Sequence, residues 1–189
     1  MKTKWSFIAV ALTALLSACS PVKEPDTDWR KEPFVDVQKA AEQGYAKAQH
    51  ILGVKYIQGE GVPQDYKQAA HWYKKAAEQG HAEAQFKLGL MYAPGLGVPQ
   101  DYKQAVHWHT KAAEQGVAEA QLELGFMYSK GYGVPQDYSQ AYAWLSVAVA
   151  KGYTFASGDR DKMAKKLTPA ELSKAQKLAT QYFEKYPTK

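Results

Sequence analysis

Two short motifs recur along this chain at one fixed spacing. AAEQG stands at residues 40–44, 76–80 and 112–116, and VPQDY stands at residues 62–66, 98–102 and 134–138, so that both return after 36 residues. Periods of this size are typical of solenoids, in which each unit buries its apolar face only against its neighbours. The spacing therefore predicts an elongated array of units of about 36 residues.

The second half of each unit has the pattern of an amphipathic helix. Asp65 stands before the first such helix as an N-cap, Gln68 follows at the spacing of a capping box, and Gly80 suits the left-handed position after the helix. The apolar side chains between these signals share one helical stripe: Tyr66, Ala69, Ala70, Tyr73, Ala76 and Ala77.

The first half of each unit is a second predicted helix, at residues 46–58 in the first copy. Ala48, Leu52 and Tyr56 form its inward stripe, and the glycines and proline that follow make continuation costly. Gly53 lies inside this helix at a cost of about 1 kcal/mol relative to alanine, so we expect close approach by the backbone of the paired helix. The predicted repeats are 46–81, 82–117 and 118–152.

Both ends of the array are predicted to be capped. A half-helix at residues 34–43 precedes the first repeat, and residues 153–189 supply C-terminal capping helices that cover an unusually apolar last repeat helix. Thr168, Pro169 and Glu171 mark the start of the final helix. Its predicted buried stripe is Leu172, Ala175, Leu178, Ala179, Tyr182 and Tyr186. The fold class is an all-α solenoid.

Residues 1–18 have the features of a signal peptide. Two lysines precede an apolar run at 5–16, which as a helix would span about 18 Å, too short for a bilayer core of about 30 Å. Residues 16–19, Leu-Ser-Ala-Cys, resemble the lipobox of bacterial lipoproteins. That resemblance implies a covalent lipid on Cys19, the only cysteine, and Ser20 after it implies the outer membrane, with the body facing the periplasm.

Residues 19–33 are predicted to be the lipidated cysteine and a proline-rich tether. Pro21, Pro25 and Pro33 are interleaved with charges, a composition that does not form a regular helix. Without Lys2 and Lys4 the chain has 22 basic and 19 acidic residues, a net charge of +3. So small an excess does not indicate a nucleic-acid partner, and the membrane is expected to be engaged through the lipid.

The conserved-looking positions within each unit make the chain similar to a known family. It resembles the Sel-one-like repeat, a relative of the tetratricopeptide repeat, over residues 34–152. The first copy matches at Ala48, Leu52, Gly53, Tyr56, Gly59, Gly61, Val62, Asp65, Ala69, Trp72, Ala76, Ala77 and Gly80. The resemblance implies a helical superhelix whose concave groove receives a protein or peptide.

The first helix of each unit has a second apolar side that is a candidate binding surface. Its members recur in register along the three units: His50, Val54, Phe86, Leu90, Leu122 and Phe126. In tetratricopeptide-like arrays such positions line the groove. The alternative is that neighbouring repeats bury these side chains against one another.

Catalytic and metal-binding signatures are weak in this sequence. The five histidines have no metal-ligand spacing, the glycine-rich turns lack the lysine of a phosphate loop, and no Gly-x-Ser-x-Gly occurs. We therefore predict a non-enzymatic envelope scaffold without metal or cofactor other than the lipid on Cys19. Two alternatives stay open: a hydrolase acting on cell-wall material or β-lactams, and a surface-exposed adaptor that binds a host protein.

Overall fold

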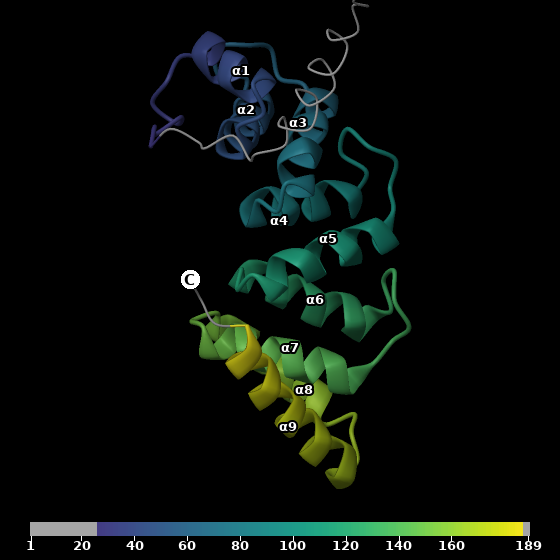
Figure 1. Cartoon of the computed structure of the whole chain (residues 1–189). Coiled ribbons are helices and arrows are strands. Elements are labelled where there is room, and N and C mark those ends of the chain that lie inside the picture. Colours follow the sequence, from purple (N-terminus) through teal and green to yellow (C-terminus); the bar gives the residue numbers. More distant parts are fainter. Residues whose placement is uncertain (1–25, 187–189) are drawn as a thin grey trace, which may run out of the picture.

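The computed structural model describes residues 26–186, and every regular element in that range is a helix. The helices follow one another as a stack of hairpins from α1 to α9 (Figure 1). They are α1 (Phe34–Glu42), α2 (Ala46–Gln58), α3 (Tyr66–Glu78), α4 (Ala82–Tyr92), α5 (Tyr102–Glu114), α6 (Ala118–Lys130), α7 (Tyr138–Ala150), α8 (Ser157–Ala164) and α9 (Pro169–Lys185), with a 3-10 turn, η1 (Thr154–Ala156). The predicted all-α solenoid is confirmed.

Each unit is one helical hairpin, α2 with α3, α4 with α5, and α6 with α7. Most helices pack chiefly against the next helix along the chain, as expected for an array held together by nearest neighbours. None of the helices within residues 26–186 is long and apolar enough to cross a membrane. Because the helices pack mainly on their neighbours, the core runs along the array as a series of linked clusters.

The second helix of each unit begins at the predicted aspartate. The carboxylates of Asp65, Asp101 and Asp137 accept hydrogen bonds from the backbone N–H groups of the second and third residues that follow. In α3 these bonds come from Lys67 and Gln68 at 2.8 and 3.1 Å. The predicted capping box is wrong for these helices, because the glutamine side chain does not return a bond to the aspartate backbone among the described contacts.

The glycine inside each first helix receives a side chain of the paired helix. A Cβ atom added at Gly53 would lie 2.6 Å from the Tyr73 ring, and one at Gly89 would lie 2.6 Å from the His109 ring. The expectation of close approach is confirmed: the approaching group is a ring at Gly53 and Gly89, and at Gly125 both the side chain and the backbone nitrogen of Leu145 approach, 2.7 and 3.2 Å from an added Cβ. Glycine is used here because a ring needs the space of its missing side chain.

A buried glutamine ties each repeat to the one before it. Gln49, Gln85 and Gln121 are nearly inaccessible, and their Nε2 groups donate to backbone carbonyls near the end of the preceding helix. Gln85 bonds to the carbonyl of Ala77 at 3.0 Å. Each of these carbonyls also accepts a backbone hydrogen bond from the glycine that follows its helix, so the glutamine adds a second bond, from a side chain, at the junction. We refer to these three residues as the glutamine clamps.

The turns within the second and third units lie close to the backbone of the preceding unit. Gly97 has φ of +70°, and an added Cβ would lie 2.1 Å from the carbonyl oxygen of Tyr66, at the start of α3. Gly133 repeats this geometry one unit later, 2.2 Å from the carbonyl oxygen of Tyr102. Each turn therefore rests on the backbone of the preceding unit.

The C-terminal cap is present as predicted. α9 begins with a complete capping box between Thr168 and Glu171, and it packs along α7. Trp144 of α7 stacks on Tyr182 with ring centroids 4.2 Å apart. The predicted stripe is less buried than expected: Ala175 and Tyr186 are buried, and the other four side chains are half-buried.

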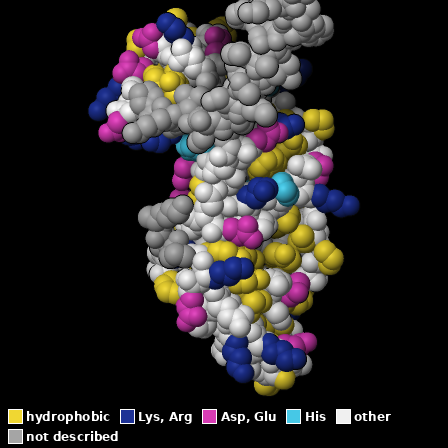
Figure 2. Space-filling view, viewed as in Figure 1, with side chains coloured by type: hydrophobic (Ala, Val, Ile, Leu, Met, Phe, Trp, Pro, Cys, Tyr) yellow, Lys and Arg dark blue, Asp and Glu magenta, His cyan; other side chains and the backbone are white. Residues whose placement is uncertain are grey.

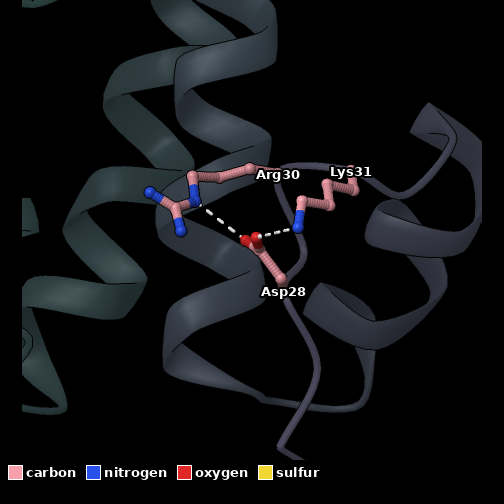
Figure 3. A network of polar contacts seen from close by, with 3 residues as sticks. All are labelled: Asp28, Arg30 and Lys31. Atoms are coloured by element: carbon pink, nitrogen blue, oxygen red, sulfur yellow. Dashed lines mark hydrogen bonds and ion pairs between the residues drawn. The ribbon is translucent and has the colours of Figure 1, made fainter.

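The N-terminal end differs from the predicted tether. Residues 26–33 form a turn in which Asp28 pairs with Arg30 at 2.8 Å and with Lys31 at 3.4 Å (Figure 3). Trp29 of this turn stacks on Tyr45, so the described part of the tether packs onto the first repeat. Residues 1–18, Cys19 and the rest of the tether lie outside the described residues.

Candidate functional site

The six predicted surface residues divide into two groups. Phe86 and Leu122 are 8% and 7% exposed and belong to core clusters, so for these two side chains the alternative of burial between repeats holds. The four others are half-buried. They are His50, Val54, Leu90 and Phe126, and each of them lines a pocket on the face formed by the first helices of the units. We call this surface the A-helix face.

The first pocket lies where the first repeat meets the second and has a volume of about 410 Å³. α2, α3 and α4 contribute its walls, and the turn after α4 contributes one edge. Its lining is Val54, Ile57, Gln58, Tyr66, Tyr73, Lys87, Leu90, Met91 and Leu96.

The second pocket lies one repeat further along and has a volume of about 430 Å³. Its lining is Ala93, Pro94, Tyr102, His109, Glu123, Phe126, Met127, Lys130 and Tyr132. All but Lys130 stand 36 positions after a lining residue of the first pocket. The two pockets are therefore the same site built twice by the repeat.

One wall position has a side chain of opposite charge in the two pockets. Lys87 lines the first pocket, and Glu123 occupies the equivalent position in the second. Burial raises the pKa of the Glu123 carboxyl, which forms no hydrogen bond or ion pair within residues 26–186. Two copies of one cavity thus present opposite charges to a ligand.

The side chain that packs over the glycine of the first helix, Gly53 or Gly89, also differs between the pockets. Tyr73 in the first pocket corresponds to His109 in the second, where burial lowers the pKa of the imidazole to about 4. His109 is therefore neutral at physiological pH. Its Nδ1 atom is buried without a hydrogen-bond partner, and its ring lies near that of Phe86 at 5.7 Å.

A third cavity, of about 520 Å³, lies at the N-terminal end of the same face. His50 lines it beside the turn of residues 26–30, with its ring 4.7 Å from that of His81. Burial, with a smaller contribution from the charge of His81, lowers the pKa of His50 to about 3. This cavity has no equivalent in the other repeats, because the N-terminal turn closes one of its sides.

Sequence reasoning found the helix positions that face the pockets but missed their rims. Glu123, Tyr102 and Tyr132 were not predicted as site residues, although Tyr102 repeats Tyr66 at 36 residues, and Glu123 and Tyr132 stand where the preceding unit has Lys87 and Leu96. Tyr102 and Tyr132 stack with ring centroids 4.8 Å apart and belong to different units. A comparison of the three copies position by position would have marked the lysine-to-glutamate exchange.

The remaining surface does not concentrate one kind of charge on the face that Figure 2 shows. Hydrophobic side chains gather there over the middle of the array, with basic and acidic groups scattered among them (Figure 2). Within residues 26–186, no group of three or more histidine, cysteine or acidic residues could hold a metal ion. His107 is exposed and His109 is buried, so they point to different sides of α5 as predicted.

Comparison with known proteins identifies the repeat. The family model described as Sel1 repeat matches residues 46–81, 82–117 and 118–153. A search of the curated proteins found no match. Among solved structures, 25 chains match.

Two of these structures show the extent of the similarity. One is a protective antigen of uropathogenic Escherichia coli strains with an SLR fold, at 43% identity and a TM-score of 0.75. The match covers 81% of this chain and 33% of the antigen, so the chain spans about a third of that protein's length. The other is a Sel1 repeat protein from Oxalobacter formigenes, at 37% identity and a TM-score of 0.62, covering 68% of this chain and 98% of that one.

The three matched units coincide with the hairpins α2–α3, α4–α5 and α6–α7. The fold is that of a scaffold suited to protein–protein interaction. The chain belongs to the Sel1 repeat family.

Proposed function

We propose that this protein is a non-enzymatic, lipid-anchored scaffold that captures a protein partner in the bacterial envelope through its A-helix face. The observation that supports this most directly is the repeated pocket: two cavities of about 410 and 430 Å³ on one face, one repeat apart. Equivalent cavities at a fixed spacing suit a polymer that places one side chain in each. A peptide chain has that character.

The apolar lining of the pockets supports a protein ligand over a small polar one. Val54, Leu90 and Phe126 are half-buried, and three of the exposed large apolar side chains, Tyr66, Leu96 and Tyr132, line the same pockets. Such incompletely covered apolar side chains mark interaction sites when they are contiguous. Burial of these groups by a partner would supply part of the binding free energy.

A photo-crosslinking amino acid at Leu90 tests the interaction. We expect irradiation of living cells to link Leu90 to a discrete protein partner. The control places the same amino acid at His107, which is exposed on α5 and lines none of the three cavities described above. Equal capture at both positions, or capture at neither, would contradict binding through the A-helix face.

The anchor is tested separately from the binding surface. With an alkyne analogue of palmitate in the medium, we expect the natural protein to take up label and Cys19→Ser to take up none. The substituted protein should be released from the membrane fraction and keep the same melting temperature, since Cys19 stands outside the packed repeats of residues 46–153. Label retained after Cys19→Ser would contradict lipidation at this residue, and with it the proposed outer-membrane location.

A surface-exposed adaptor that binds a host protein is the second candidate. Its support is that one similar structure is described as a protective antigen. This version requires that the folded part be reached from outside the cell. If protease added to intact cells leaves the protein whole but degrades it after lysis, the periplasmic version stands and the host-facing version fails.

A further inference from the structure

The second pocket contains a carboxyl group without a partner. Glu123 lies in its wall, half-buried, without a hydrogen bond or ion pair in the described part of the chain. Most half-buried carboxylates in proteins are compensated by a partner, because loss of hydration disfavours the charged form. A cationic ligand would supply the missing partner.

Two basic side chains line the same pocket, His109 and Lys130, and neither of them neutralises the Glu123 carboxyl. His109 is neutral and so adds no positive charge. Lys130 lines the pocket too, but it is exposed and stands seven residues from Glu123, about 10 Å along the helix axis. The Lys130 ammonium is therefore hydrated at the rim and does not neutralise the carboxylate, with which it forms no ion pair.

Aromatic groups complete the chemistry expected of a cation site. The stacked pair of Tyr102 and Tyr132 forms one edge, and the Phe126 ring lines the wall. Ring faces attract ammonium and guanidinium groups, and the aliphatic stem of a lysine or arginine gains from contact with the same apolar walls. A carboxylate within such walls favours a long basic side chain over a free metal ion, which would need several oxygen ligands.

We propose that the second pocket binds a lysine or arginine side chain of the protein partner, an inference that rests on the proposed function. The first pocket supplies an internal comparison, because Lys87 stands where the second pocket has Glu123. Like charge disfavours a basic side chain there. The pair of pockets thereby gives the partner a direction: its basic residue lies toward α6 and its apolar or acidic residue toward α2.

Amide chemical-shift titration with defined probes tests the assignment. Nα-acetyl-lysine amide and Nα-acetyl-arginine amide are compared with Nα-acetyl-norleucine amide, which has the apolar stem of lysine without its charge. We expect the basic probes to shift amides around Phe126 and Tyr132, and to bind about tenfold more tightly than norleucine. Amides around Leu90, in the first pocket, should move little.

Two charge-matched variants separate the pocket from general electrostatics. Glu123→Gln keeps the side-chain shape and should reduce affinity for the basic probes about tenfold. Glu114→Gln removes the same charge from an exposed position of α5 that lines neither repeated pocket, and should leave binding unchanged. The spectra also report whether each variant is folded.

Three results would overturn the inference: equal binding of the norleucine probe, no response to the basic probes, or undiminished affinity in Glu123→Gln. Its failure can be told apart from failure of the proposed function. If Leu90 crosslinks a protein but the probes show no preference for positive charge, only the cation assignment fails. If the basic probes bind but no protein is crosslinked, the pocket stands and the scaffold function fails.

Discussion

Replacing Gly97 by alanine tests how the repeats are joined. At φ of +70° an alanine pays about 1–2 kcal/mol of backbone strain. Its Cβ would also lie 2.1 Å from the carbonyl oxygen of Tyr66, so the turn must move away from α3 at a cost typical of overpacking, about 1–3 kcal/mol. We expect a total loss of about 3 kcal/mol, which for a chain of this length lowers the melting temperature by about 6–12 °C.

The matched control is Gly80→Ala. Gly80 has φ of +89°, and an added Cβ would have no atom within 4 Å, so this variant has the strain without the collision. Its expected loss is about 1–2 kcal/mol. Thermal unfolding followed by circular dichroism at 222 nm measures both variants. Equal losses for Gly97→Ala and Gly80→Ala would refute the reasoning that the turn is pressed against the preceding unit.

Two further predictions concern side chains of the A-helix face and its core. Phe86→Ala should cost about 3–5 kcal/mol of unfolding free energy, because Phe86 is only 8% exposed. Phe126→Ala should cost less than half as much and weaken partner capture instead. Similar losses of unfolding free energy for the two variants in urea would contradict this division. The pKa of His109 is about 4 in the folded protein and about 6.5 in the unfolded chain. Between these pH values the unfolded state binds more protons, so the free energy of unfolding falls by up to about 3 kcal/mol as the pH is lowered through that range. His109→Leu, which copies Leu145 at the equivalent position, should remove the contribution of His109 to this dependence, measured by urea unfolding at pH 7 and pH 4.5, and leave that of His50, whose pKa burial also lowers. An unchanged pH dependence after His109→Leu would contradict the assignment.

The fold was predictable because its signals are local and repeated. A period of 36 residues, an aspartate before each second helix and a glycine after it determine where the helices begin and end. The side chain that covers Gly53, by contrast, depends on how two helices cross, and helix pattern alone does not reveal that a Tyr73 ring fills the space. The capping box failed for a related reason: its spacing is present, but the backbone N–H of Asp65 donates to the carbonyl of Tyr56 in the paired helix at 3.0 Å and so is not left for Gln68.

The candidate site was predictable only in part, since each pocket draws residues from three elements. Helical periodicity identified Leu90 and Phe126, because each of them stands on the second apolar side of its helix. Tyr132 enters from a turn, and Glu123 lies beside the apolar row rather than in it. Phe86 and Leu122 occupy the same helical face as the pocket residues, but side chains of neighbouring helices bury them, and that packing cannot be read from the pattern of a single helix.

The glutamine clamps have a consequence for how such proteins change length. Each clamp joins a unit to its predecessor through the same side chain and an equivalent carbonyl, so the junction between the first and second units is interchangeable with that between the second and third. A whole unit inserted or deleted in register would arrive with its own clamp and leave every remaining junction intact. Gene duplication in steps of 36 codons therefore lengthens or shortens the binding surface at little structural cost.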